Sequence, residues 1–190
     1  MSTKTSELLA GTAPATVAVV RGVADDQLDL PTPCLEFRVR DLLNHLFDVV
    51  VNFQTLARRE AVDWAAKEDR LTAGWRDRFA VEVERTVEAW SDPAAVEGES
   101  AGMGLPQATV GDMLLTDLTV HGWDLARATG QPMAAPPDAL TALHGFLDRM
   151  GTMGQQTGAF GPPVKVASGA TELDRLVART GRDPRWAPAV

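Results

Sequence analysis

The chain has 190 residues, of which 45% are hydrophobic and 23% are charged, and its formal net charge at pH 7 is −8. This composition is ordinary for a globular protein, and the length suffices for a sizeable core in one domain covering residues 1–190. The negative charge and the lack of a Lys/Arg cluster exclude a nucleic-acid-binding face and an electrostatic membrane contact.

The single cysteine, Cys34, excludes an internal disulfide and is typical of a reducing compartment, so we expect a cytoplasmic protein. No apolar run approaches the roughly 20 residues that a membrane span needs. The N-terminal stretch carries Glu7 and has no convincing cleavage site, which favours a helix of the mature protein over a signal peptide.

Helical periodicity dominates the chain, and strand signals are weak because tyrosine is absent and alternating β-branched runs are rare. The predicted helices cover residues 6–23, 39–59, 71–90, 109–129, 137–153 and 171–179. Thr109 is expected to cap the fourth helix, and Gly130 followed by Pro132 is expected to end it. The pattern predicts an all-α fold, an antiparallel four-helix bundle with a short additional C-terminal helix.

The predicted helix over residues 109–129 carries charge within its apolar stripe. At 100° per residue, the apolar arc consists of Val110, Leu114, Leu118, Leu125 and Ala128. Asp117 and His121 fall near the centre of this arc, and Asp124 lies at its edge. A buried carboxylate needs a partner, and the i,i+4 spacing brings Asp117 and His121 together. Such a pair is the geometry by which one helix offers two ligands to a metal ion.

A third ligand has to come from another helix, and His45 in "RDLLNHLFDVV" is the best candidate. It lies at the margin of an apolar face formed by Leu42, Leu43, Leu46, Val50 and Phe53. Two imidazoles and a carboxylate suit Zn²⁺ with open positions, or Ni²⁺, Mn²⁺ or Fe²⁺. The alternative is a metal-free bundle in which Asp117 and His121 form a buried hydrogen-bonded pair. His144 borders another apolar face and is interpreted as structural or exposed.

Two stretches carry a family resemblance: "TPCLEFRVRDLLNHL" and, about seventy residues later, "LLTDLTVHGWDLARATGQ". In this order the chain resembles the DinB-like metal-binding superfamily, and within it the actinobacterial branch that includes the N-terminal domain of mycothiol-dependent maleylpyruvate isomerase. The ending "FGPPVKV…ATELDRLVARTGRDPRW" is also similar to that branch. The resemblance implies a four-helix bundle with a divalent metal ion held by three side chains, which match His45, Asp117 and His121.

The resemblance further implies an activity. A metal-bound thiol is deprotonated and becomes a good nucleophile at neutral pH. We therefore expect an S-transferase or isomerase that uses a low-molecular-weight thiol, mycothiol, against a small electrophile. Asp124 would orient a ligand or the co-substrate; the alternative is a salt bridge with Arg127 or Arg40. Because bundles of this kind often form dimers, a homodimer is among the expected states.

The sequence departs from the isomerase pattern in two ways. Isomerase members typically have Glu where this chain has Asp117, and the full isomerase has a second, C-terminal domain, whereas this chain stops soon after the bundle. We therefore do not expect maleylpyruvate isomerisation itself. Two other functions stay open: a non-catalytic metal-binding or stress protein, and a lyase or hydrolase that uses metal-bound water.

Other residues near the motifs have two interpretations each. The Cys34 thiol is expected to be buried as a small hydrophobe, the alternative being a reactive thiol near a helix N-terminus. Trp123 points away from Asp117 and is expected to pack. In the tail, Trp186 is expected to dock on the bundle with Arg182 and Asp183 capping, the alternative being that the tail lines the mouth of the site.

Overall fold

A computed structural model describes residues 4–66 and 68–188 of the chain. It contains the helices α1 (Lys4–Gly22), α2 (Val39–Ala57), α3 (Trp75–Ser91), α4 (Gln107–Thr129), α5 (Pro137–Gln156) and α6 (Glu172–Arg179), with 3-10 turns at Asp25–Gln27 and Pro93–Val96. The described residues form no strand, and their only β-pairing is two isolated bridges. The predicted all-α bundle is therefore confirmed. None of the described helices is long and apolar enough to cross a membrane.

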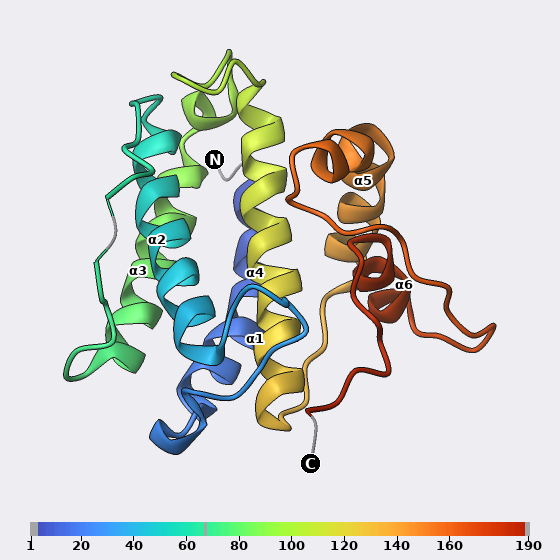
Figure 1. Cartoon of the computed structure of the whole chain (residues 1–190). Helices are drawn as coiled ribbons and strands as arrows, with labels where there is room; N and C mark the ends of the chain where they lie inside the picture. The colour runs from blue at the N-terminus through green and yellow to red at the C-terminus, as the bar shows by residue number, and fades with distance from the viewer. Residues whose placement is uncertain (1–3, 67, 189–190) are drawn as a thin grey trace.

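Helices α1 to α4 form the bundle (Figure 1). Going once around the bundle axis, neighbouring helices follow in the order α1, α3, α2, α4. Helices α1 and α4 run parallel, as do α2 and α3, whereas α2 and α4 run in opposite directions. This arrangement differs from a simple up-and-down bundle because the connection over residues 58–74 returns along the bundle before α3 begins. Helix α5 packs on α4 and α1, and α6 packs on α5.

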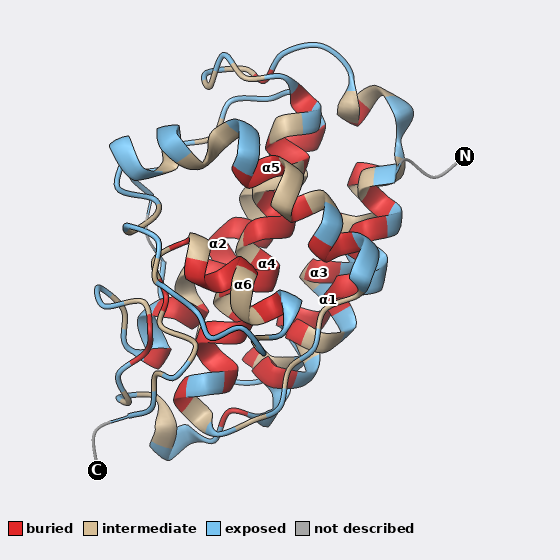
Figure 2. Ribbon diagram, turned by 90° about the vertical axis from the view of Figure 1, so that its right-hand side faces the viewer, coloured by how far each residue is buried: buried red, intermediate tan, exposed pale blue. Residues whose placement is uncertain are grey.

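Helix α4 is the central element of the core. All five residues of its predicted apolar arc are at most 2% exposed, and so are the five predicted for α2. Figure 2 shows that buried residues lie where the helices face one another, while exposed residues lie on the outer surfaces. Because α4 contacts α1, α2 and α5, more than one of its faces is buried.

Two helix starts differ from the prediction for tertiary reasons. Helix α4 begins at Gln107, two residues before Thr109, because the buried Gln107 amide donates to the Leu56 carbonyl at 2.7 Å and fixes the first turn against α2. Helix α3 begins at Trp75 and not at residue 71, because the preceding Gly74 has the left-handed φ of 75° that no helix can include.

Buried hydroxyl and indole groups join the bundle helices through backbone carbonyls. Thr16 Oγ1 in α1 donates to the Leu118 carbonyl of α4 at 2.8 Å, and Thr86 Oγ1 in α3 donates to the Val50 carbonyl of α2 at 2.7 Å. The Trp90 indole N–H donates to the Phe53 carbonyl at 3.1 Å. These bonds satisfy polar atoms inside the core. They also fix the axial position of α1 relative to α4 and of α3 relative to α2.

Replacing two of the glycines by alanine is expected to change stability in opposite directions. Gly130 ends α4 with φ 71°, while Gly151 lies within α5, and a Cβ at either position would meet no atom within 4 Å. Gly130→Ala should therefore lower the free energy of unfolding by about 1 kcal/mol, through the left-handed backbone alone. Gly151→Ala should raise it by about 0.5–1 kcal/mol through helix propensity. Urea denaturation measures both, and a change of the same sign in the two variants would contradict this account.

Candidate metal centre

The three predicted ligands come together between α2 and α4. His121 Nε2 lies 3.6 Å from Asp117 Oδ1, and His45 Nε2 lies 3.9 Å from the same oxygen. One donor atom from each residue lies within 4.8 Å of the other two. His45 is brought opposite Asp117 and His121 because α2 and α4 are neighbours that run in opposite directions. The arrangement offers two imidazole nitrogens and one carboxylate oxygen to a common point.

The burial of the polar residues on α4 differs from the prediction. Asp117 and His121, expected at the centre of the apolar arc, keep 26% and 11% of their side chains exposed, whereas Asp124, expected at its edge, is fully buried. The reason lies outside α4: the segment that follows α6 covers the side of the helix that carries Asp124, and α2 leaves the other two partly open. The ligand atoms are therefore accessible to a small molecule.

Asp124 forms a buried ion pair with Arg182. The Arg182 guanidinium, in a residue only 7% exposed, donates from Nη2 to Asp124 Oδ2 at 3.1 Å and from Nε to Oδ1 at 3.4 Å. The predicted alternatives for Asp124 are wrong: Arg40 pairs with Asp29 at 2.9 Å, and Arg127 donates to the Pro184 carbonyl at 2.7 Å. The partner lies 58 residues away along the chain, in a part of the sequence that gives no periodic signal.

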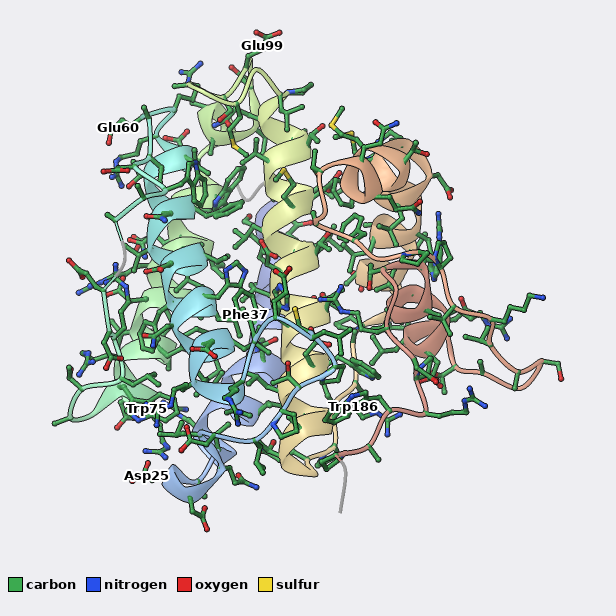
Figure 3. The ribbon with its side chains drawn as sticks, viewed as in Figure 1. Asp25, Phe37, Glu60, Trp75, Glu99 and Trp186 are labelled. Carbon is green, nitrogen blue, oxygen red and sulfur yellow. The ribbon has the colours of Figure 1, made fainter. Side chains whose placement is uncertain are left out.

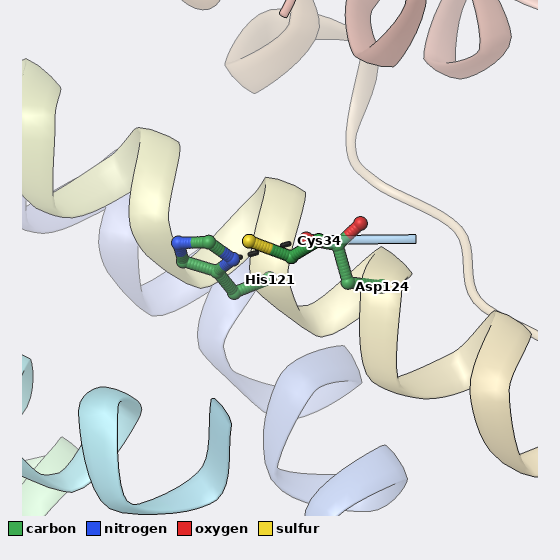
Figure 4. Close-up of side chains that lie close together, drawn as sticks. All are labelled: Cys34, His121 and Asp124. Carbon is green, nitrogen blue, oxygen red and sulfur yellow. Dashed lines mark hydrogen bonds and ion pairs between the residues drawn. The ribbon is translucent and has the colours of Figure 1, made fainter. Parts of the chain in front are cut away.

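The same carboxylate orients His121. Asp124 Oδ2 lies 3.0 Å from His121 Nδ1 (Figure 4). A carboxylate paired with a guanidinium only accepts hydrogen bonds, so Nδ1 carries the proton and the lone pair of the neutral ring is on Nε2. That nitrogen faces Asp117, and ligating histidines characteristically donate their other N–H to a carboxylate in this way. The residues present therefore fit a divalent ion.

Phe37 covers the imidazoles from the loop before α2. Its ring stacks on His45 with centroids 5.4 Å apart and meets the His121 ring edge-on at 6.5 Å (Figure 3). The Thr32 hydroxyl donates to the Phe37 carbonyl at 2.7 Å and holds this loop in place. Phe37 was not predicted as part of the site, although it lies inside the quoted motif "TPCLEFRVRDLLNHL". An apolar ring there limits water on one side of the ligand set.

Cys34 lies beside the His121 ring and close to Asp124 (Figure 4). Cys34, His121 and Asp124 also have donor atoms within 4.8 Å of one another. This second set fits a metal less well, because Asp124 and His121 Nδ1 already bond to each other and the Asp124 carboxylate also accepts from Arg182. Burial, in addition, raises the pKa of the half-buried Cys34 thiol, which disfavours the thiolate that a metal binds. The geometry favours the structural interpretation of Cys34.

The remaining predicted residues follow their structural interpretations, with one exception. Trp123 is buried, and the Arg127 guanidinium lies 5.3 Å from its ring centroid. His144 Nδ1 lies 3.1 Å from Arg179 Nη1, between α5 and α6. Trp186 packs against the core (Figure 3), as predicted for a docked tail. Arg182 is the exception, because it does more than the predicted capping: its Nη1 donates to the carbonyl of Thr180, where α6 ends, and the same guanidinium pairs with Asp124 and lines a cavity beside the site.

That cavity, of about 250 Å³, opens between α4 and α5 and has Asp117 and His121 in its wall. A larger hollow of about 740 Å³ lies between α1 and α3, and no histidine or cysteine lines it. We consider the smaller one as the functional cavity, because a molecule bound there touches the ligand set, whereas the larger hollow offers no comparable chemistry.

Comparisons with known proteins place the chain in a family. A family model described as the mycothiol maleylpyruvate isomerase N-terminal domain matches residues 10–126, which include all three predicted ligands. The uncharacterized proteins MT0763 and Rv0738 of Mycobacterium tuberculosis, from strains CDC 1551 / Oshkosh and H37Rv, are each 35% identical to it over 131 residues. The match covers 65% of this chain and 66% of each relative, just under two thirds of their length. No solved structure matches the chain significantly.

The buried ion pair between Asp124 and Arg182 is expected to have a large coupling energy. Arg182→Met should lower the free energy of unfolding by about 3 kcal/mol, because the Asp124 charge loses its main partner inside the protein. Adding Asp124→Asn should restore part of that loss, giving a coupling of about 1–3 kcal/mol in a double-mutant cycle measured by urea denaturation. Strictly additive effects of the two substitutions would contradict the interaction.

Proposed function

The chain belongs to the mycothiol maleylpyruvate isomerase N-terminal domain family, and from this premise we propose that it binds one divalent metal ion and uses it to activate a low-molecular-weight thiol. The proposed ligands are His45, Asp117 and His121, with Zn²⁺ the expected metal and Ni²⁺, Mn²⁺ or Fe²⁺ as alternatives. The proposed reaction is transfer of the thiol, mycothiol, to a small electrophile, by an S-transferase or an isomerase.

The observation that carries this proposal is the orientation of His121. Its Nδ1 is held by a carboxylate that is itself held by Arg182, and its Nε2 faces Asp117 and His45. A metal-free hydrogen-bonded pair would instead bring His121 Nε2 within hydrogen-bond distance of Asp117 Oδ1. At 3.6 Å, moreover, the gap between Asp117 Oδ1 and His121 Nε2 is longer than a hydrogen bond and leaves room for an ion between them.

Asp117 supports the proposal despite its short side chain. Its Oδ1 reaches to within 4 Å of both imidazole nitrogens, so the carboxylate needs no extra methylene to join them. A divalent ion bound there supplies a Lewis acid that lowers the pKa of a coordinating thiol. Within the chain, Asp124 keeps His121 in the ligating tautomer and Phe37 limits water at the imidazoles. These roles need no residue beyond the matched family region except Arg182.

The open cavity favours a reaction over metal storage. A non-catalytic metal-binding protein is expected to close its ligand set with bulky side chains, whereas here a hollow of about 250 Å³ borders Asp117 and His121. A small molecule can therefore approach the ligand set from the side of α5. We propose thiol transfer in preference to maleylpyruvate isomerisation itself, because the cavity offers no free cationic side chain for a dicarboxylate.

The ligand assignment predicts the metal content of two histidine variants. His121→Ala should lose near-stoichiometric metal after reconstitution with Zn²⁺, because two remaining ligands hold the ion weakly. His144→Ala is the matched control: it removes a half-buried histidine of α5 outside the ligand set and should retain the metal. Elemental analysis of the folded proteins measures both, and full metal occupancy in His121→Ala would overturn the assignment.

The proposed reaction predicts thiol dependence. With 1-chloro-2,4-dinitrobenzene, the thiol sulfur replaces chloride on the ring, and chloride and the thiol proton are released. The absorbance of the aryl thioether product measures the rate. The reconstituted protein should accelerate this only with mycothiol present, and His121→Ala should lose the acceleration while His144→Ala keeps it. If the protein instead formed 2,4-dinitrophenol from water at an equal rate without thiol, a hydrolase using metal-bound water would be favoured.

A further inference from the structure

The cavity beside the ligand set has two chemically different ends. Polar residues gather at the end next to α4: Thr116, Asp117, His121 and Arg182. The end next to α5, here called the far end, is built from apolar side chains of α5 and the following segment: Phe146, Met150, Met153 and Phe160. Met113 and Val120 of α4 also line the cavity. A molecule that reaches Asp117 and His121 with one end therefore leaves its other end among thioether and aromatic groups.

Within the described residues, the cavity wall offers no unpaired cationic side chain to an anionic ligand. Among the lining residues in the described part of the chain, Arg182 is the only Lys or Arg, and its guanidinium is already engaged. Nε and Nη2 donate to Asp124, and Nη1 donates to the Thr180 carbonyl at 3.1 Å. A carboxylate held among the apolar side chains of the far end would lose part of its hydration and gain no ionic partner there, which is unfavourable. An uncharged apolar group loses nothing there.

At the far end, the Phe160 ring packs directly on the backbone of α5. Gly154, in the last turn of α5, has no side chain, and the Phe160 ring occupies the place where a Cβ would lie. The Phe160 N–H also donates to the Gly154 carbonyl at 3.0 Å, which folds the chain back over the cavity. The three methionines give the wall a flexible surface that adapts to different apolar shapes. The hollow, at about 250 Å³, is smaller than the roughly 300–1,000 Å³ typical of drug-sized ligands.

We propose that this cavity binds a small, uncharged apolar group of the electrophile, and that the reacting end of the same molecule lies at Asp117 and His121. This inference rests on the proposed function, because it assigns the substrate class of the same site. It separates the substrate of this chain from a dicarboxylic acid, whose second carboxylate would face Met150 and Phe160.

Binding of a fluorescent probe tests the proposal without metal or thiol chemistry. 1-Aminonaphthalene, a small uncharged aromatic amine, should bind saturably with one molecule per chain, both to the protein as purified and after chelation. Met150→Glu should weaken this binding about tenfold or more, because it puts a carboxylate in the apolar end. Met150→Gln, which keeps the length and adds no charge, should weaken it about threefold and serves if the Glu variant does not fold.

Val87→Glu is the matched control, since Val87 is a half-buried wall residue of the larger hollow between α1 and α3. It should leave probe binding unchanged. Naphthalene-1,5-dicarboxylate should fail to displace the probe at ten times its concentration. Absent saturable binding, loss of binding in Val87→Glu, or displacement by the dicarboxylate would each overturn the proposal. Probe binding by a protein that takes up no metal would support the apolar cavity and overturn the proposed function. Metal uptake without probe binding would support the proposed metal site and overturn the inference about the cavity.

Discussion

The buried contact between Asp124 and Arg182 is the interaction on which the rest of the site depends. A carboxylate with no exposed surface in the central helix is tolerated only with a partner, and the partner arrives from the segment after α6. The same pair brings the tail against α4, closes one side of the cavity and leaves an acceptor for His121 Nδ1. One ion pair thus joins the stability of the C-terminal segment to the orientation of a proposed ligand.

The directions of the bundle helices explain why the ligands meet at all. Because α2 and α4 run in opposite directions side by side, His45 near the start of α2 lies opposite the second half of α4. The loop that enters α2 then brings Phe37 against both imidazoles and Cys34 beside His121. Residues that are close together in the quoted motif therefore act at one place, although only His45 supplies a donor atom to the proposed ligand set.

The site combines polar ligands with an apolar cavity, and this combination has a physical consequence for reactivity. The Phe37 ring limits water on one side of the ligand set, so electrostatic interactions there are stronger than at a fully exposed surface. The imidazoles and Asp117 nevertheless keep enough exposed surface for a small molecule to approach. Such a site suits a reaction between a thiol and an apolar electrophile better than the binding of a polyanion.

The sequence by itself determined the helices, the apolar arcs of α2 and α4, and the three residues that could share a metal ion, because helical periodicity and i,i+4 spacing are local properties. The spacing could not rank the burial of Asp117 and Asp124, since that depends on which neighbour covers each side of α4. Arg182, Phe37 and the cavity wall likewise come from segments far from α4 along the chain. Only the tertiary structure decided them, because contacts between distant segments follow from packing and leave no periodic trace in the sequence.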